Sequence, residues 1–432
     1  MSASVLNSRP RIVVVGAGFA GLNFSKKFPA GHARITVVDR QNHHMFQPLL
    51  YQVATAGLSA VDIAQPVRAI LNDRADLDVL MAEVTGFDLA AKKVRHTAGE
   101  LAYDYLVLGL GGVTNYFGHD EWAQFAPGLK TLDDALKIRR KILLAYEHAE
   151  TEPDESRRKE LMTIVVIGGG PTGVELAGAF AELTRTVLKK DFDRIDPTTA
   201  RVLLVEGSPR LLNAFPADLS ASAQRQLKLL GVEVRTGARA TAIREGEIEV
   251  DGETIRAANV IWGAGVSAHP LTRTLGVELD RAGRVRILPD LSVPGHPEVF
   301  ALGDMTTLTD ARGVVVPGLS PAALQMGAHA AKVIAAEIEN GKRTPSDRAA
   351  YAYVDKGSMA TIGRSSAVAM TGRLHFSGYP AWIAWLGVHL IFLIGFRNKI
   401  SVLLQWAYSY LTYKRGARVI TGLGGESPAH SA

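Results

Sequence analysis

The sequence predicts an α/β protein with two parallel β-sheets, and three observations lead to this fold class. Short apolar, β-branched runs recur along the chain, helix-like segments lie between several of them, and the runs fall into two series that begin near residues 11 and 163. Fully apolar strands that alternate with helices are typical of parallel sheets buried on both faces. The expected strands are Ile12–Val15, Ile35–Asp39, Tyr105–Leu108, Ile164–Ile167, Val202–Glu206, Val260–Trp262 and Val299–Leu302.

Composition narrows the function classes. A chain of 432 residues has room for two or three domains, and 47% hydrophobic with 21% charged residues is ordinary for a folded protein. The net charge of +5 gives no support for a nucleic-acid partner. With no cysteine in the sequence, disulfides, thiolate metal sites and redox-active thiols are excluded. No histidine or carboxylate spacing marks another metal site, so we expect none.

The first strand leads into a glycine-rich loop, V-V-V-G-A-G-F-A-G, which contains Gly16, Gly18 and Gly21. The first glycine permits a tight turn, the second lets the backbone approach a pyrophosphate, and the third allows the following helix to pack against the strand. The positive end of that helix favours phosphate. Asp39 ends the next strand, where a carboxylate can accept hydrogen bonds from ribose hydroxyls. The loop therefore predicts a dinucleotide site.

The second series repeats this loop as I-V-V-I-G-G-G-P-T-G-V-E, with Gly168, Gly170 and Gly173 at the same spacing. Glu206 ends the strand that follows and would meet the ribose. A carboxylate there repels a 2′-phosphate, so NADH is favoured over NADPH, although Arg210 lies nearby. Two dinucleotide loops in one chain imply hydride transfer from a nicotinamide to a flavin, with FAD in one site and NAD(H) in the other.

A later run, E-V-F-A-L-G-D, ends at Gly303 and Asp304, where a carboxylate could hold the ribityl chain or pyrophosphate of a flavin nucleotide. Ser320 and Pro321 then predict a helix start, with the serine as its cap. A helix N-terminus aimed at the flavin pyrimidine would stabilise negative charge on reduction. A purely structural capped helix is the alternative.

The C-terminal region is apolar and rich in aromatic residues. Leu374–Phe396 contains no acidic or basic residue other than histidine, but Gly and Pro interrupt it, and a second apolar stretch follows at Ile400–Tyr413. The basic residues that flank this second stretch are Lys399, Lys414, Arg415 and Arg418. Aromatic rings and basic residues at the edges of apolar helices suit a bilayer interface. We expect residues 376–418 to form two interfacial helices on an anionic lipid surface, with a buried or dimer-forming helix pair as the alternative.

Four segments of the chain resemble the type II NADH dehydrogenases, which are single-subunit, non-proton-pumping NADH:quinone oxidoreductases. They are N-H-H-M-F-Q-P-L-L-Y-Q-V-A-T-A-G-L at Asn42–Leu58, G-G-G-P-T-G-V-E-L-A-G at Gly168–Gly178, I-W-G-A-G-V at Ile261–Val266 and V-H-L-I-F-L-I-G-F-R-N-K at Val388–Lys399. This family belongs to the two-dinucleotide-binding flavoproteins of glutathione-reductase type. Thiol-disulfide reductases and sulfide:quinone oxidoreductases share that fold but use cysteines, which this chain lacks.

The resemblance implies non-covalent FAD, NADH as substrate, hydride transfer to flavin N5 and reduction of a membrane quinone. It implies that FAD contacts Gly16, Gly18, Gly21, Asp39, Gly303 and Asp304, and that NADH contacts Gly168, Gly170, Gly173, Glu206, Gly263 and Gly265. Glu175, expected in the first turn of its helix, and Gln325 are the candidate catalytic residues. The quinone-side candidates are Gln47, Ser320, Pro321 and Gln325. Many members carry A-Q-x-x-x-Q beside the quinone, and only the second glutamine is present here.

We expect an FAD-binding domain at 1–130 and 275–340, an NADH-binding domain at 131–274 and a membrane-associated domain at 341–432. No signal pattern precedes the first strand, which favours a peripheral enzyme on the cytoplasmic face of a bacterial inner membrane. The oligomeric state stays open, and a homodimer is one alternative. Two rival functions also stay open: an NADH-dependent reductase of a soluble carrier such as ferredoxin or rubredoxin, and a flavin-based NADH-sensing binding protein.

Overall fold

The computed structural model describes residues 9–341, 344–412 and 417–420. Backbone contacts divide the chain into two units. The first unit comprises Met1–Met45, Ala64–Val113 and Val266–Lys356, and the second comprises Phe46–Ile63, Thr114–Gly265 and Gly357–Ala432. These units follow contacts, whereas the domains expected at 1–130 with 275–340, at 131–274 and at 341–432 follow ligand binding. That functional division stays a prediction.

The main sheet of the first unit has the strand order β20-β21-β9-β1-β2-β5. All neighbours pair in parallel except β20 with β21. The strands are β1 Arg11–Val15, β2 Arg34–Asp39, β5 Leu77–Met81, β9 Tyr105–Leu108, β20 Ser292–Val293 and β21 His296–Ala301. Four expected strands are thus confirmed to within three residues at their ends. Their apolar side chains are buried because helices and loops cover both faces.

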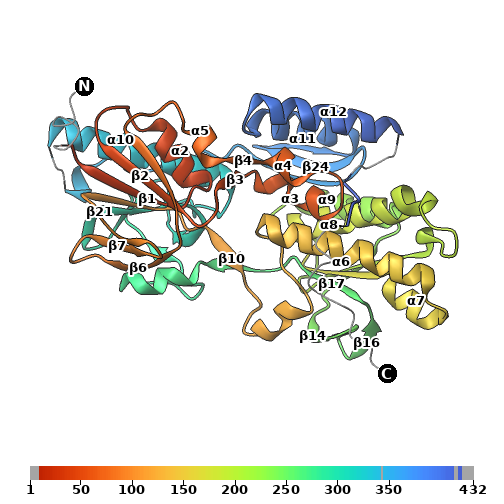
Figure 1. The fold of residues 1–432 in the computed structure, drawn as a ribbon. Coiled ribbons are helices and arrows are strands. Elements are labelled where there is room, and N and C mark those ends of the chain that lie inside the picture. Colours follow the sequence, from red (N-terminus) through yellow and green to blue (C-terminus); the bar gives the residue numbers. More distant parts are fainter. Residues whose placement is uncertain (1–8, 342–343, 413–416, 421–432) are drawn as a thin grey trace. The chain divides into compact units, whose positions relative to one another are not determined.

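Two helices of the first unit pack against each other beside this sheet (Figure 1): α2 (Phe19–Lys27) and α10 (Ser320–Asn340). A Cβ on Gly327 would lie 2.4 Å from the Ala20 carbonyl oxygen, so the two backbones touch there. The remaining elements of the unit are β3 His43–Met45, β4 Ala64–Pro66, α5 Val67–Ile70, β6 Val84–Asp88, β7 Lys93–His96, β8 Gly99–Ala102, β18 Val266–Ala268, η6 Pro270–Leu275, β19 Val285–Arg286, η7 Gly303–Met305, β22 Thr306–Thr307 and η8 Pro345–Asp347. β10 (Gly112–Thr114) runs to where the second unit begins.

The second unit contains a fully parallel sheet in the order β13-β12-β11-β17. Its strands are β11 Thr163–Ile167, β12 Arg201–Glu206, β13 Glu233–Thr236 and β17 Asn259–Trp262, and three of them are the strands expected from the sequence. Its helices are α3 Leu50–Ala54, α4 Ala60–Ile63, α6 Leu132–Thr151, α7 Glu155–Leu161, α8 Pro171–Glu182 and α9 Ala217–Leu229. An antiparallel sheet of β14 Ala240–Arg244, β15 Glu247–Val250 and β16 Glu253–Arg256 packs its apolar residues with the parallel sheet. Short helical turns complete the unit: η1 Gln47–Leu49, η2 Asp120–Gln124, η3 Leu183–Val187, η4 Leu188–Lys190 and η5 Pro197–Thr199.

The C-terminal part of the second unit begins with an antiparallel sheet of β23 Ser358–Gly363, β24 Ser366–Thr371 and β25 Leu374–Ser377. Two helices follow, α11 (Tyr379–Phe392) and α12 (Phe396–Thr412), and Figure 1 shows them beside β24. The expected helix pair is confirmed, although the apolar run opens as a strand because Gly378, at φ 69°, turns the chain before α11. Within the described ranges, no helix combines the length and apolarity that crossing a bilayer requires.

Candidate active site

The loop between β1 and α2 has the geometry expected of a phosphate-binding turn. Gly16 has φ +97°, and a Cβ on it would lie 2.4 Å from the Gly109 carbonyl oxygen. A Cβ on Gly21 would lie 2.0 Å from the Gly16 oxygen, whereas a Cβ on Gly18 would meet no atom within 4 Å. The crowded glycines bring helix and strand together, and the open one exposes backbone at the N-terminus of α2. No acidic side chain lies in the first turn of α2 to compete with a phosphate.

Asp39, whose ribose contact stays a prediction, holds this loop in place. One carboxylate oxygen accepts the Ala17 N–H at 2.6 Å, and the other accepts the Gln41 N–H at 2.7 Å. A carboxylate has about four acceptor positions, so both oxygens keep capacity for hydroxyl donors.

His44 adds an unpaired polar atom next to the same loop. Its Nδ1 lies 2.9 Å from the Ala17 carbonyl oxygen, so Nδ1 carries the hydrogen and donates it. Burial lowers the pKa of His44, and its buried Nε2 has no hydrogen-bond partner among the described residues. Open backbone at a glycine loop and a buried acceptor without a partner are typical of a ligand-binding site. The first unit therefore fits FAD.

Gly303 and Asp304 begin the short helix η7, and Gly303 has φ +75°. A Cβ on either Gly112 or Gly318 would lie 3.5 Å from an atom of the Asp304 side chain. Asp304 thus lies among glycines of the first unit, where backbone approaches it closely. Its contact with FAD stays a prediction.

The loop between β11 and α8 repeats the first loop closely. Gly168 has φ +104°, and a Cβ on Gly173 would lie 1.7 Å from the Gly168 oxygen, whereas a Cβ on Gly170 would meet nothing within 4 Å. Glu206 accepts the Gly169 N–H at 2.5 Å and the Ser208 N–H at 2.6 Å. Each unit thus has a glycine loop closed by a carboxylate from the next strand and open at its second glycine.

Gly263 and Gly265 follow β17 beside this second loop. A Cβ on Gly263 would lie 3.3 Å from the Gly173 Cα, and one on Gly265, at φ +70°, would lie 2.7 Å from the Asn115 carbonyl oxygen. Both glycines therefore permit close backbone packing, and a direct role in NADH binding stays a prediction.

Glu175 lies in the second turn of α8, not in the first turn as expected, because the helix begins at Pro171. Dipole stabilisation at the helix start therefore does not explain this carboxyl group. Its burial raises the pKa of Glu175 to about 8, and a hydrogen bond with the Thr361 backbone opposes that rise. At neutral pH the group holds a proton.

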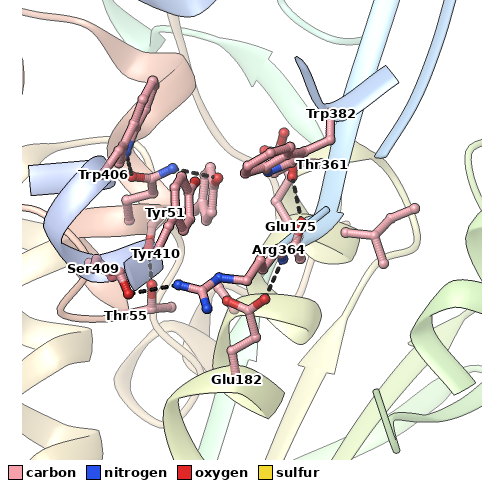
Figure 2. A pocket seen from close by; sticks show the side chains of 15 residues that line it. Tyr51, Thr55, Glu175, Glu182, Thr361, Arg364, Trp382, Trp406, Ser409 and Tyr410 are labelled. Atoms are coloured by element: carbon pink, nitrogen blue, oxygen red, sulfur yellow. Dashed lines mark hydrogen bonds between the residues drawn. The ribbon is translucent and has the colours of Figure 1, made fainter. Parts of the chain in front are cut away.

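Glu175 lines a cavity that opens to solvent. Figure 2 shows this cavity, whose lining comes only from the second unit: α3, α8, β23, α11, α12 and adjoining loops. The lining residues are Tyr51, Gln52, Thr55, Gly57, Glu175, Ala179, Glu182, Thr361, Ile362, Gly363, Arg364, Trp382, Trp406, Ser409 and Tyr410. Aromatic walls with a few polar groups are typical of a site for a small, flat molecule.

Sequence reasoning missed most of these residues. Arg364 donates to the Ser409 carbonyl oxygen at 2.7 Å, its guanidinium lies 5.0 Å from the centre of the Tyr410 ring, and its backbone N–H donates to Glu182. Arg364 comes from a β-turn with no motif, so the sequence carries no signal for it. Tyr51 does lie within the run that marked the family resemblance.

The quinone-side candidates lie elsewhere. Gln47 belongs to η1. The Gln325 side-chain amide donates to the Val354 carbonyl oxygen at 3.0 Å and accepts the Val354 N–H at 2.9 Å. Ser320 is the first residue of α10 rather than its cap, because the helix begins one residue earlier than expected, with Leu319 as N-cap. Pro321 follows it in the first turn. None of these four lines the cavity, and their quinone contacts stay predictions.

Two glycine loops on two parallel sheets, each closed by a carboxylate, define a two-dinucleotide-binding flavoprotein. Residues 10–327 match the pyridine nucleotide-disulphide oxidoreductase family. The chain is 45% identical over 427 residues to the type II NADH:quinone oxidoreductase Ndh of Mycobacterium tuberculosis, covering 96% of this chain and 90% of that protein. It is 29% identical to the type II NADH:quinone oxidoreductase of Staphylococcus haemolyticus, covering 86% and 92%. The chain therefore belongs to the type II NADH:quinone oxidoreductases.

Among solved structures, NDH2 from Plasmodium falciparum in complex with NADH matches with a TM-score of 0.86 at 19% identity, covering 96% of this chain and 100% of that one. At this identity the match establishes the fold alone, and it confirms the predicted fold class.

The two open glycines supply a matched pair of tests. Because a Cβ at Gly18 or Gly170 meets no protein atom, each alanine variant should fold but should obstruct a phosphate. Hydrogen bonds to charged groups contribute about 1.5–3 kcal/mol, so we expect Gly18→Ala to lose FAD affinity about tenfold or more, measured by flavin release on dilution. Gly170→Ala should keep its flavin and raise the KM for NADH by a similar factor. Equal flavin retention in both variants would contradict the assignment of the two loops.

Proposed function

We propose that this chain oxidises NADH and reduces a membrane quinone through bound FAD, as a respiratory enzyme that pumps no protons. The observation that carries the proposal is the pair of dinucleotide loops in a chain without cysteine, since no thiol can relay the electrons. Relatives that align over nine-tenths of their length bear the name type II NADH:quinone oxidoreductase. FAD would bind the segments 1–130 and 275–340, NADH would bind 131–274, and 341–432 would contact lipid.

Bound FAD would supply two-electron chemistry, a hydride from NADH accepted at N5 and both electrons passed to the quinone. The net reaction converts NADH, one proton and quinone to NAD⁺ and quinol. The residues of this chain therefore have three tasks: they orient two nucleotides, admit a quinone and provide a proton.

Glu206 would select NADH. Its oxygens already accept two backbone N–H groups of the loop region, at 2.5 and 2.6 Å, so the carboxylate is fixed at the place where a ribose 2′-hydroxyl would donate. A 2′-phosphate would meet this negative charge. The proposed coenzyme is therefore NADH rather than NADPH.

Glu175 would hold the proton. Its carboxyl group lines the cavity, and burial raises its pKa to about 8, so the protonated form prevails under neutral conditions. A general acid works best when its pKa lies near the working pH. The proposed acceptor in this cavity is the quinone.

The outer faces of α11 and α12 would rest on lipid. Ile391 and Leu404 are 68% and 63% exposed, and other apolar side chains continue this face: Tyr379, Ile383, Val388, Phe392, Ile400, Leu403 and Tyr408. The inner face of α12 buries Val402 and Trp406 and also carries polar contacts. Ser401 donates to Asp62, and the Trp406 indole donates to Gln52, both at 2.8 Å. An exposed apolar face of this extent suits an apolar surrounding.

Basic residues lie near this face. Arg397 and Lys399 belong to the first turn of α12, and Arg418 forms an ion pair with Asp191. Lys414 and Arg415 lie outside the described residues. The proposed location is peripheral, on the cytoplasmic face of a bacterial inner membrane, where anionic headgroups attract lysine and arginine. The same apolar face could instead join two copies of the chain as a homodimer.

One assay separates the proposed function from its two rivals. Purified protein is mixed with NADH and offered either a quinone in lipid vesicles or a soluble ferredoxin or rubredoxin, with NADPH as the comparison donor. We expect sustained turnover with NADH and the vesicle quinone alone. Turnover only with the soluble carrier would favour a carrier reductase, and flavin reduction without turnover on either acceptor would favour a sensing protein.

The proton role of Glu175 predicts a pH dependence. The wild-type proton-transfer step should be fully active below pH 8, where the carboxyl is protonated, and should slow about tenfold per pH unit above it. Glu175→Gln holds no acidic proton, so its quinone reduction should be about 100-fold slower. Its rate should also lack the fall above pH 8. Steady-state rates from pH 6 to about pH 10 test this. If the variant shows the same fall in rate above pH 8, the ionisation that causes this fall belongs to another group.

The lipid-facing role of α11 and α12 predicts loss of membrane binding in an Ile391→Glu/Leu404→Glu variant, because two charges would be forced into the interface. We expect co-sedimentation with anionic vesicles to fall about tenfold or more. Leu229→Glu is the matched control, since Leu229 is 87% exposed on α9, outside this face. If both variants sediment like the wild type, these helices do not bind lipid. A change in oligomeric state, measured by light scattering, would favour the dimer.

A further inference from the structure

Three buried side chains form a directed chain of hydrogen bonds that ends at the cavity. The Trp406 indole Nε1 donates to Gln52 Oε1 at 2.8 Å, and Gln52 Nε2 donates to the Tyr51 hydroxyl oxygen at 2.8 Å. All three residues line the cavity, and Figure 2 labels Trp406 and Tyr51 there. Trp406, Gln52 and Tyr51 are nevertheless only 5%, 9% and 6% exposed as whole residues. The chain runs from α12 inward to α3.

The chemistry of these groups fixes the direction of the chain. An indole N–H can only donate, so the amide must turn its oxygen toward Trp406 and its NH₂ group toward Tyr51. The Tyr51 oxygen therefore receives a hydrogen, and its own hydrogen is left to be donated elsewhere. Because Tyr51 lines the cavity, we expect that hydrogen to be available to a molecule bound there.

We propose that the Tyr51 hydroxyl donates a hydrogen bond to a carbonyl oxygen of the quinone in this cavity, with Gln52 and Trp406 as positioning residues that aim it. This inference rests on the proposed function. A hydrogen-bond donor aimed at a quinone oxygen stabilises the negative charge that develops there on reduction.

The surroundings of Tyr51 keep its proton in place. Burial first, and the negative charge that Glu175 carries once it ionises above about pH 8 second, raise the pKa of the Tyr51 phenol well above its usual range. The other charged groups that line the cavity are Glu182 and Arg364, and these two are joined through the Arg364 backbone N–H. Tyr51 thus stays neutral and able to donate, while the neighbouring Glu175 supplies the acidic proton.

The test separates the two half-reactions in anaerobic stopped flow on the FAD-loaded protein. In Tyr51→Phe, reoxidation of the reduced flavin by a short-chain benzoquinone should slow about 10- to 100-fold, whereas flavin reduction by NADH should keep its wild-type rate. Tyr146→Phe is the matched control, because Tyr146 is a buried tyrosine of the same unit whose hydroxyl has no partner among the described residues and does not line the cavity. That control should match the wild type in both steps.

The positioning role is tested by a double-mutant cycle. Gln52→Met keeps the side-chain length but cannot donate, so it should slow reoxidation by a smaller factor than Tyr51→Phe. The double variant should then be no slower than Tyr51→Phe alone, since the amide acts through the hydroxyl. Trp406→Phe should repeat the Gln52→Met effect. Melting temperatures and flavin content confirm that each variant is folded.

Two results would overturn the inference while leaving the proposed function intact: reoxidation of Tyr51→Phe within twofold of the wild type, or losses that simply multiply in the double variant. Failure of the quinone to reoxidise the wild-type flavin would instead contradict the proposed function itself.

Discussion

Both nucleotide sites depend on one steric constraint, the contact between the third glycine of each loop and the carbonyl of the first. The Cβ positions of Gly21 and Gly173 lie 2.0 and 1.7 Å from those oxygens, so any side chain would drive helix and strand apart. Because the first and third glycines of each loop lie so close to each other, α2 and α8 each begin directly after a strand, with Gly18 and Gly170 as their N-caps. The backbone at these two N-caps is open. Placement of phosphate follows from that geometry.

The second unit adds a different kind of environment to its nucleotide loop. Around the cavity, burial keeps a carboxyl and a phenol protonated, so the site holds hydrogen-bond donors without placing full charges in an apolar pocket. Part of the wall comes from α12, whose inner side chains Ser401 and Trp406 donate to α4 and α3 while its outer face exposes apolar residues. The same helix thus shapes the cavity and carries the proposed lipid contact, which suits an enzyme whose acceptor dissolves in a bilayer.

The sequence predicted the parts of the molecule that depend on local pattern. Apolar runs located most of the parallel strands, though not β5 or β13, and the glycine spacing with Asp39 and Glu206 located both loops, because each needs only residues close in sequence. The cavity could not be predicted in this way. Glu175 is displaced by a turn from its expected helix position, and Gln52 meets Trp406 only through folding, across more than 350 residues. Gln325, chosen by its motif, instead pairs with backbone at Val354, a contact that no local pattern encodes.

Flavin absorbance, followed in the absence of oxygen, shows whether one flavin connects NADH to a quinone in this chain. The purified protein is mixed first with NADH and then with a quinone. We expect full bleaching of the oxidised flavin band by about one equivalent of NADH and full recovery on about one equivalent of quinone, since both transfers carry two electrons. A preparation without flavin, or a flavin that NADH fails to bleach, would contradict this expectation.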